Sequence, residues 1–348
     1  MRKWKGYFLF TRRAGQSILS ITRAVGAFLC VHFTRCRMSE ATPDESLTSI
    51  RIAVHLKNNG VTCEQLIGKG TYSTVKKAWS SKYGKVVAIK IIDKRSESRY
   101  IRDFLPRELQ IVPKLNHDNI IKVYDVIQSG PIVCLVEEYA LNGDLLRRIQ
   151  VNTRLNEDES RFYFRQLVEA LMYLKSIKVA HRDLKCENIL LDSCDNVKLC
   201  DFGFARTINN GELSSTFCGS RAYAAPEILR QIPYDGFMVD VWSAAIVLYI
   251  MVTGVMPYNY DKPRKMLNQQ LKHKISFPKL IFLSNDVKGL IFHMLHPCPA
   301  ERLTYQEIVQ SKWLVNTPFY IRTESMAFTR RKLMSAEVFV EKMNGSRD

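Results

Sequence analysis

The sequence lacks the paired cysteines on which disulfide frameworks and structural zinc sites depend. Its nine cysteines are odd in number, and no two of them form a C-x-x-C pair. Both kinds of site need paired or regularly spaced thiols. We therefore expect reduced cysteines in a cytoplasmic protein, because disulfides rarely persist in a reducing compartment.

The sequence also lacks an unbroken hydrophobic run of membrane-spanning length. One uncharged stretch, residues 241–260, is long enough to cross a bilayer. However, Gly254 and Pro257 interrupt this stretch, and several polar residues dilute it. It is therefore predicted to be a buried helix that ends near Gly254.

Acidic residues are absent from the first 39 positions, which contain eight lysines and arginines. This composition is typical of a mitochondrial presequence or of a helix lying on a membrane surface. The alternative is that Met38 is the working start, because the M-S-E-A-T-P-D-E-S-L that begins there is an ordinary polar N-terminus. Both interpretations stay open. Membrane contact or mitochondrial targeting is expected only if residues 1–37 are present.

The net charge of +17 falls to +9 once this basic extension is left out. A basic surface attracts nucleic acid and lipid headgroups. No nucleic-acid-binding motif accompanies the charge, so no nucleic-acid partner is expected. At 348 residues, with 46% apolar and 24% charged residues, the chain can bury the core of one large domain or of two lobes.

Short strand-like runs come first along the chain and helical periodicity follows. This order predicts an α+β fold in two lobes. The predicted strands cover residues 64–67, 74–79, 86–92, 122–128 and 132–138, and the clearest helices cover 99–115 and 157–176.

Two motifs lie in the strand-rich part. G-K-G-T-Y-S-T-V at 68–75 provides glycines that let the backbone approach phosphates, although this pattern alone also fits an ordinary hairpin. V-A-I-K at 87–90 places Lys90 inside an apolar strand, where burial is costly unless an anion compensates the charge. The carboxylate of Glu108, eighteen residues later, is the expected partner, although a lysine whose charge reaches solvent is the simpler alternative.

Three further motifs follow in order. H-R-D-L-K-C-E-N at 181–188 offers a carboxylate to orient a hydroxyl and take its proton, a lysine to neutralise a phosphoryl group, and an amide oxygen to bind a metal. D-F-G at 201–203 supplies a carboxylate suited to Mg²⁺. A-P-E at 225–227 closes the segment that begins at Asp201. Together these motifs predict phosphoryl transfer.

With these motifs the chain resembles the eukaryotic protein kinases, and within them the testis-specific serine kinases of the calmodulin-dependent and AMP-activated kinase group. The closer resemblance rests on runs such as F-L-P-R-E-L at 104–109 and T-F-C-G-S-R-A-Y-A-A-P-E-I-L at 216–229. It implies the two-lobed kinase fold, with a small β-rich N-lobe that has one main helix and a larger helical C-lobe. The expected parts are a basic extension (1–39), a linker (40–60), the N-lobe (61–140), the C-lobe (141–314) and a basic tail (315–348).

The resemblance implies ATP and Mg²⁺ as cofactors and a role for each matching residue. Asp183 would be the catalytic base, and Lys185 the phosphate-contacting lysine that marks serine/threonine kinases. Asn188 and Asp201 would bind Mg²⁺. Glu227 would pair with Arg302, and Asp240 would anchor the loop at 181–182. The expected ATP-binding residues are Gly68, Lys69, Gly70, Val75, Ala88, Lys90, Glu108, Glu138, Ala140 and Asp144.

The resemblance also implies regulation and partners. Thr216 matches the activation-loop phosphosite, and Arg182 would bind its phosphate; the alternative is a loop threonine without a regulatory role. Asp144 and Glu187 match positions that contact arginine upstream of the phosphorylated Ser or Thr of a protein substrate. An upstream activating kinase, a chaperone and a role in male germ cells are further implications.

Three positions depart from the family pattern. Ser73 replaces a glycine of the first motif, and Ala245 stands where many kinases have a glycine. Glu137 lies where relatives usually have an apolar residue or threonine, at the rear of the adenine site. Ala245 and Glu137 keep one alternative open, a pseudokinase or scaffold that binds partners without phosphoryl transfer.

Overall fold

The computed structural model describes residues 43–326, except positions 97 and 210. The chain divides into two compact units, Met1–Thr48 and Ser49–Asp348. The basic extension at 1–39 and the tail beyond residue 326 lie outside the described residues. One helix crosses the boundary between the units, and the other described helices and strands all lie in the second unit.

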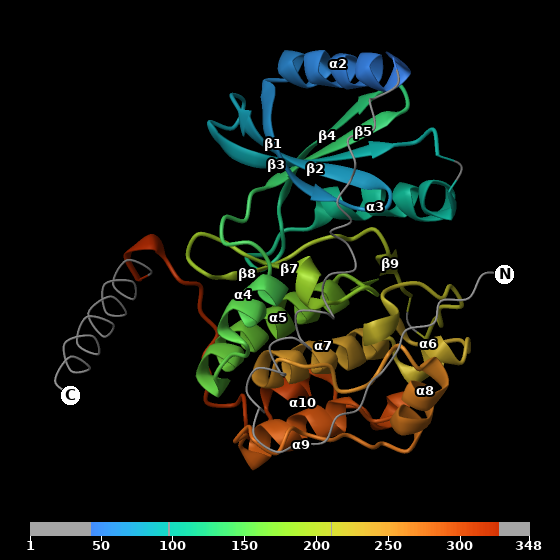
Figure 1. Ribbon diagram of the computed structural model, residues 1–348, viewed down its shortest axis with the longest axis vertical. Coiled ribbons are helices and arrows are strands. Elements are labelled where there is room, and N and C mark those ends of the chain that lie inside the picture. The colour runs from blue at the N-terminus through green and yellow to red at the C-terminus, as the bar shows by residue number, and fades with distance from the viewer. Residues whose placement is uncertain (1–42, 97, 210, 327–348) are drawn as a thin grey trace, which may run out of the picture. The chain divides into compact units, whose positions relative to one another are not determined.

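A five-stranded antiparallel sheet forms the first lobe, in the order β1-β2-β3-β5-β4 (Figure 1). The observed strands agree with the predicted ones to within three residues at each end, which confirms the β-rich lobe. They are β1 (Val61–Lys69), β2 (Ser73–Ser80), β3 (Lys85–Asp93), β4 (Val123–Ser129) and β5 (Ile132–Glu138).

A helix, α2 (Pro43–Asn58), occupies most of the segment expected to be a linker. The prediction of a linker did not specify a helix here. Ile52 and Leu56 are four positions apart and therefore share one helix face. Leu56 is buried, and both residues pack against a hydrophobic cluster of the sheet that includes Val61 and Val87. Burial of this apolar face fixes the segment on the sheet.

The single helix expected at 99–115 is divided into three. A π-helical turn, η1 (Tyr100–Phe104), leads into α3 (Leu105–Ile111), and a 3₁₀ turn, η2 (Val112–Lys114), follows. Prolines stand in the first turns of α3 and η2. Because proline has no N–H to donate, it interrupts the regular ladder of helix hydrogen bonds.

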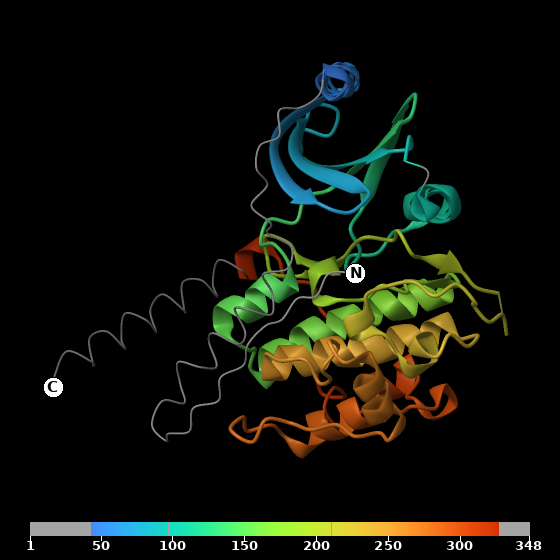
Figure 2. The same cartoon turned by 45° about the vertical axis from the view of Figure 1, so that its right-hand side comes forward.

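The second lobe is helical (Figures 1 and 2), so the predicted α+β order is confirmed. Two short two-stranded sheets, β6–β9 and β7–β8, lie beside its helices. The strands are β6 (Val179–Ala180), β7 (Ile189–Leu191), β8 (Val197–Leu199) and β9 (Arg206–Thr207). The short 3₁₀ turns are η3 (Cys186–Asn188), η4 (Arg221–Tyr223) and η5 (Pro299–Glu301). The helices are α4 (Leu145–Asn152), α5 (Glu157–Ser176), α6 (Pro226–Leu229), α7 (Gly236–Thr253), α8 (Pro263–Leu271), α9 (Asn285–Met294) and α10 (Tyr305–Val309).

Helix α7 is long and apolar enough to cross a membrane, but nearly all of it is buried inside the protein. It ends at Gly254, which has a φ of 74°. A Cβ at this position would lie 2.1 Å from the carbonyl oxygen of Thr153, so only glycine fits. The predicted buried helix ending near Gly254 is confirmed.

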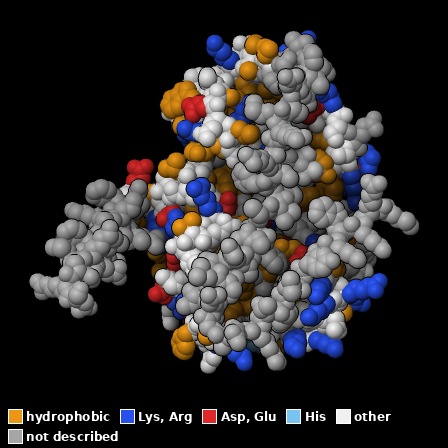
Figure 3. All heavy atoms as spheres, viewed as in Figure 1, with side chains coloured by type: hydrophobic (Ala, Val, Ile, Leu, Met, Phe, Trp, Pro, Cys, Tyr) orange, Lys and Arg blue, Asp and Glu red, His pale blue; other side chains and the backbone are white. Residues whose placement is uncertain are grey.

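Exposed basic side chains gather around α8, at the lower right of Figure 3. Arg264 and Lys265 lie in α8 itself, and Lys272 and Lys274 follow it; all four are exposed. Part of the positive charge that remains outside the N-terminal extension is therefore on a solvated surface.

The first residues of the expected tail, which we call the C-terminal strap (315–322), pack against the helical lobe. Gln166 of α5 donates to the carbonyl oxygen of Tyr320 over 2.9 Å, and the Tyr320 ring lies 5.2 Å from that of Phe162. Asn196 and Arg322 exchange two hydrogen bonds, of 2.9 and 2.8 Å. The folded domain therefore extends past residue 314.

Truncation after Leu314 is expected to lower the melting temperature by roughly 10 °C. The reason is that the lost contacts include the three hydrogen bonds and the aromatic contact just described, at about 1 kcal/mol each, and each kcal/mol is worth about 2–4 °C in a domain of this size. Differential scanning calorimetry measures the change. A chain ending at residue 326 retains the strap and serves as the control. Equal melting temperatures for the two truncated chains would contradict the assignment.

Candidate catalytic site

Lys90 lies in the middle of β3, opposite Val75 of β2 and Leu135 of β5. It is only 7% exposed. Its Nζ donates to Oε1 of Glu108 in α3 over 2.7 Å and to Oδ1 of Asp201 over 2.8 Å. Burial opposes the positive charge, but the two carboxylates outweigh burial and raise the pKa of Lys90 well above its usual value. The lysine is therefore charged, and it connects Glu108 of the first lobe to Asp201 of the second.

Asp201 follows β8, with a φ of 61° in the left-handed region. Its side chain is 43% exposed. The Lys90 ammonium lowers the pKa of Asp201 to about 2, against the opposing effect of burial. The carboxylate is therefore ionised.

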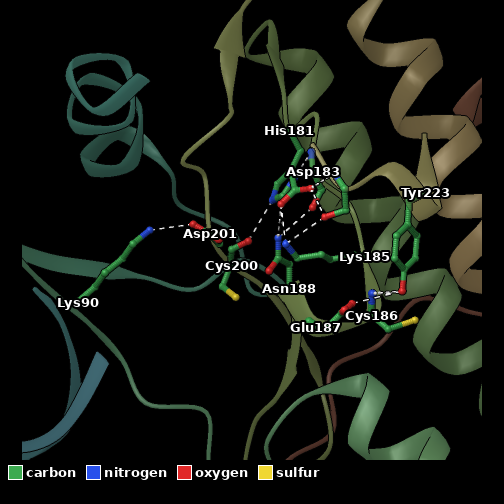
Figure 4. Close-up of polar contacts among 11 residues, drawn as sticks. Lys90, His181, Asp183, Lys185, Cys186, Glu187, Asn188, Cys200, Asp201 and Tyr223 are labelled. Carbon is green, nitrogen blue, oxygen red and sulfur yellow. Dashed lines mark hydrogen bonds and ion pairs between the residues drawn. The ribbon is translucent and has the colours of Figure 1, made fainter. Parts of the chain in front are cut away.

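Asp183 lies in the loop between β6 and η3 and is 4% exposed. Its Oδ2 accepts from Lys185 Nζ over 2.8 Å (Figure 4). Its Oδ1 accepts from the backbone N and the Oγ of Ser220, over 2.8 and 2.9 Å. The Nδ2 of Asn188 donates to the Asp183 carbonyl oxygen over 2.9 Å. The carboxylate, the lysine and the amide predicted from one motif thus converge.

The Asp183 loop is anchored on the core helix α7. Asp240 accepts from the backbone N of His181 over 2.7 Å and from that of Arg182 over 2.8 Å. Burial raises the pKa of Asp240 to about 7, although the two N–H groups favour its ionised form. The Nε2 of His181 lies 3.0 Å from the carbonyl oxygen of Cys200.

The loop is also tied to the start of the D-F-G segment. The backbone N of Cys200 donates to the carbonyl oxygen of Asn188 over 2.9 Å. Asp201 is the next residue, so Asn188 and Asp201 are held close by the backbone. Figure 4 shows Asn188 and Asp201 together with Lys90, Asp183 and Lys185.

The oxygens left over at Asn188 and Asp201 suit a hard divalent cation. Asn188 donates through Nδ2, which leaves its Oδ1 without a donor among the described residues. The Oδ1 of Asp201 accepts from Lys90, and its Oδ2 also has no donor among the described residues. Mg²⁺ prefers carboxylate and amide oxygens of this kind together with phosphate oxygens.

The glycine motif forms a tight turn between β1 and β2. Lys69 ends β1. The backbone N of the next residue, Gly70, donates to the carbonyl oxygen of Ser73 over 2.8 Å. Gly68 lies opposite Val75, and Val75 lies opposite Lys90. Gly68 and Val75, both predicted to cover the nucleotide, therefore lie in one row across the sheet with Lys90.

The other predicted ATP-binding residues lie at the end of β5 and beyond. Ala88 faces Glu137 in the register of β3 and β5. The Glu138 N–H donates to the carbonyl oxygen of Lys122 over 2.8 Å, and the Ala140 backbone makes no hydrogen bond with the other described residues. Asp144 caps α4 by accepting from the backbone N of Arg147 over 2.8 Å.

Glu137 is a carboxylate in unusual surroundings. Burial raises its pKa to about 7, while the positive charge of Lys90 opposes this rise. Its side chain accepts no hydrogen bond from the described residues. The other departure, Ala245, is fully buried in α7. Neither residue displaces Lys90, Asp183 or Asp201 from the catalytic arrangement.

The segment between D-F-G and A-P-E connects Thr216 to Arg182 through a tyrosine. The Tyr234 hydroxyl donates to the carbonyl oxygen of Thr216 over 2.7 Å, and Arg182 Nη1 donates to the same hydroxyl over 3.2 Å. Arg182 is 4% exposed, and its buried Nη2 has no hydrogen-bond partner among the described residues. Gly219 packs so closely that a Cβ there would lie 2.6 Å from the Arg182 carbonyl oxygen.

Glu227 and Arg302 form a buried double contact, of 2.6 Å from Nη1 to Oε1 and 2.7 Å from Nη2 to Oε2. The sequence predicted this pair. It did not single out Ser220, Tyr234 or Tyr100, whose side chains contact predicted site residues. For Ser220 a signal existed, since it lies within the family-like run at 216–229 that contains A-P-E.

Comparison with known proteins agrees with this geometry. The family model for the protein kinase domain matches residues 61–314. The chain is 44% identical over 269 residues to testis-specific serine/threonine-protein kinase 1 of Homo sapiens, covering 75% of this chain and 73% of that protein. It is 46% identical over 266 residues to testis-specific serine/threonine-protein kinase 3 of Homo sapiens, covering 75% and 98%. Serine/threonine-protein kinase SIK2 of Gallus gallus is 38% identical over 272 residues, covering 78% and 34%.

Proposed function

The chain belongs to the protein kinase family and is a serine/threonine kinase, and from that premise we propose that it transfers the γ-phosphate of ATP, with Mg²⁺, to protein substrates. The observation that carries the proposal is the position of Asp183. Its buried carboxylate lies 2.8 Å from Lys185 Nζ, in a loop tied through Asn188 and Cys200 to Asp201 and so to Lys90.

Each side chain has a role that follows from its chemistry. Asp183 orients the substrate hydroxyl and takes its proton as the hydroxyl oxygen bonds to the γ-phosphorus, while the bond from that phosphorus to the β–γ bridging oxygen breaks and ADP leaves. Lys185 neutralises the phosphoryl group, and Lys90 holds the α- and β-phosphates while paired to Glu108. Asn188 and Asp201 would hold Mg²⁺, which when bound neutralises charge on the phosphates.

The test is a transfer assay with purified protein, radiolabelled ATP, Mg²⁺ and a protein substrate. Label is expected on serine and threonine but not on tyrosine, and chelation of the metal with EDTA should abolish transfer. Equal labelling with and without EDTA would overturn the metal assignment. Labelling of tyrosine alone would overturn the substrate assignment.

Phosphorylation of Thr216 by an upstream kinase is part of the proposal. Arg182 has a buried, unpartnered Nη2 among the described residues and already contacts Tyr234, which binds the Thr216 backbone. A phosphate adds nearly two negative charges and three acceptor oxygens. Because Arg182 also belongs to the Asp183 loop, binding that phosphate would order the activation segment around the catalytic base.

Replacing Thr216 by alanine is expected to lower kcat by about tenfold, because the phosphate that orders the segment is lost. The measurement compares kcat of the wild-type and Thr216→Ala proteins. Both proteins are either treated with an activating kinase or isolated from cells. Ser215→Ala removes the neighbouring exposed hydroxyl and should leave kcat unchanged. Undiminished activity of the Thr216→Ala protein would contradict a regulatory role.

A preference for arginine or lysine upstream of the phosphorylated residue is proposed from two carboxylates. Glu187 accepts from the Tyr223 hydroxyl over 3.3 Å, and Tyr223 lies between Thr216 and the A-P-E motif. The negative charge of Asp144 contributes to the raised pKa of Glu187, although burial contributes most. Two neighbouring carboxylates favour a guanidinium.

A peptide array with arginine at each upstream position measures this preference. The arginine-containing peptides are expected to be phosphorylated about tenfold better, and Glu187→Gln should remove most of the gain. A flat array would refute the proposal without affecting the assignment of kinase activity.

The cell type is proposed from the relatives' names, which say testis-specific, and the compartment and the chaperone are proposed from the sequence and its resemblance. We infer a cytoplasmic kinase of male germ cells that is assisted by a chaperone during folding. Immunostaining of testis sections tests the cell type and compartment. Co-purification tests the chaperone. Intact-mass measurement shows whether residues 1–37, and with them any membrane or mitochondrial targeting, are present.

A further inference from the structure

Tyr100 connects to the lysine–glutamate pair through a second oxygen of the glutamate. Its hydroxyl donates to Oε2 of Glu108, while Oε1 of Glu108 accepts from Lys90. Glu108 is 1% exposed and Tyr100 is 6% exposed. Both oxygens of this buried carboxylate are therefore occupied by donors, and one of the donors is a residue outside the family motifs.

The glycine-rich turn reaches the same tyrosine. Tyr72 stacks on Tyr100 with ring centroids 4.8 Å apart and an angle of 7° between the planes. Tyr72 lies between Gly70 and β2 and is 41% exposed. An exposed aromatic side chain in a glycine-rich turn gains little by itself, but stacking on a buried ring fixes the position of the turn.

The D-F-G segment also lies against Tyr100. A Cβ at Gly203 would lie 3.1 Å from Cε2 and 3.4 Å from the hydroxyl oxygen of Tyr100. Such contacts are tighter than ordinary van der Waals separation. The glycine at 203 therefore leaves the space that the Tyr100 ring fills.

The π-helical turn η1 explains how one side chain reaches all three elements. Tyr100 is the first residue of this turn and Glu108 lies eight positions later, in α3. A π-turn is wider than an α-helical turn and is commonly found at functional sites.

We propose that Tyr100 is a positioning residue of the kinase site, and that the Tyr72–Tyr100 stack, here called the aromatic latch, holds the glycine-rich turn in the nucleotide-binding position. The hydroxyl of Tyr100 fixes Glu108 and through it Lys90. The ring of Tyr100 stacks with Tyr72 of the turn and also packs against Gly203. The proposal rests on the proposed ATP-dependent transfer.

Two variants separate the two parts of Tyr100. Tyr100→Phe keeps the stack and removes the hydroxyl, which leaves Oε2 of a buried carboxylate without a donor. kcat/KM for ATP is then expected to fall about tenfold. Tyr72→Ala removes the stack and leaves the hydroxyl in place. KM for ATP is then expected to rise about fivefold, with kcat changed less than about twofold.

The matched controls are Tyr72→Phe and Tyr83→Phe. Tyr72→Phe retains a ring and should restore the KM for ATP. Tyr83→Phe removes a tyrosine hydroxyl that donates to the carbonyl oxygen of Tyr124 over 2.9 Å, elsewhere in the sheet lobe, and should leave both constants unchanged. Melting temperatures and calorimetric titration with ADP accompany the kinetics, so that loss of fold is distinguished from loss of nucleotide affinity.

Wild-type kinetics for both Tyr100→Phe and Tyr72→Ala would overturn the proposal. So would an equal loss in Tyr72→Phe and Tyr72→Ala, because the stack would then have no role. Absence of transfer by the wild-type protein would instead count against the proposed function, and ADP titration would still report on the latch.

Discussion

Replacing Asp183 by asparagine is expected to lower kcat by about a thousandfold while leaving the fold intact. The asparagine oxygen can still accept from the backbone N of Ser220, whereas the amide nitrogen that replaces Oδ2 cannot accept from Lys185. The amide cannot take a proton from the substrate hydroxyl, however. The loss should therefore appear in kcat at saturating ATP and peptide, and the melting temperature should change little.

The matched control for Asp183→Asn is Asp158→Asn. It makes the same chemical change at a side chain that is 92% exposed, on the surface of α5. Its kcat should equal that of the wild type. Wild-type kcat in the Asp183→Asn protein would refute the role of this carboxylate. If the wild-type protein showed no more transfer than Asp183→Asn, the pseudokinase alternative would be favoured.

The residues of the motifs could be predicted because each is a polar or charged residue in a local context, such as an apolar strand, where that residue type is uncommon. Lys90 is a charged residue in an otherwise apolar strand, and such a residue must find anions in the folded protein. The structure supplies two, Glu108 and Asp201, from separate parts of the chain. The motifs identified Lys90, offered Glu108 as its partner and assigned Asp201 to Mg²⁺, but they did not predict the contact between Lys90 and Asp201.

The contacts that complete the site could not be predicted in the same way. Tyr100 looks like any aromatic residue on a predicted helix, and only the wider η1 turn and the position of the glycine-rich turn give it three neighbours. The Nη2 of Arg182, unpartnered among the described residues, likewise depends on where Tyr234 lies, fifty-two residues further along the chain. Such features depend on tertiary packing and leave no periodic trace in the sequence.

Helix α2 at 43–58 was not predicted from the sequence. Ile52 and Leu56 nevertheless provide enough apolar surface to hold a helix on the sheet. Tertiary burial outweighs a weak local preference, which is the usual reason that sequence-based boundaries fail. The catalytic residues are unaffected, because none of them lies in this helix.

Replacing Glu227 by glutamine is expected to destabilise the protein by about 3–5 kcal/mol, and so to lower the melting temperature by roughly 10 °C. Glu227 and Arg302 are 3% and 0% exposed at their side chains and share two hydrogen bonds. Removing one charge leaves the other buried without compensation. The guanidinium also donates to the carbonyl oxygen of Met238, so it cannot move to solvent without losing further contacts.

Two further variants show whether the cost comes from the unpaired charge. Glu227→Leu combined with Arg302→Met removes both charges and should recover part of the lost stability, because two apolar side chains do not require compensation in the core. Asp125→Asn breaks the exposed pair with Lys82 and should leave the melting temperature unchanged, because solvent screens surface pairs. If the single and double core variants melted together, lost packing would be the cause. Because Glu227 ends the segment that carries Thr216 and Ser220, the single variant should also lose transfer activity at temperatures well below its unfolding transition.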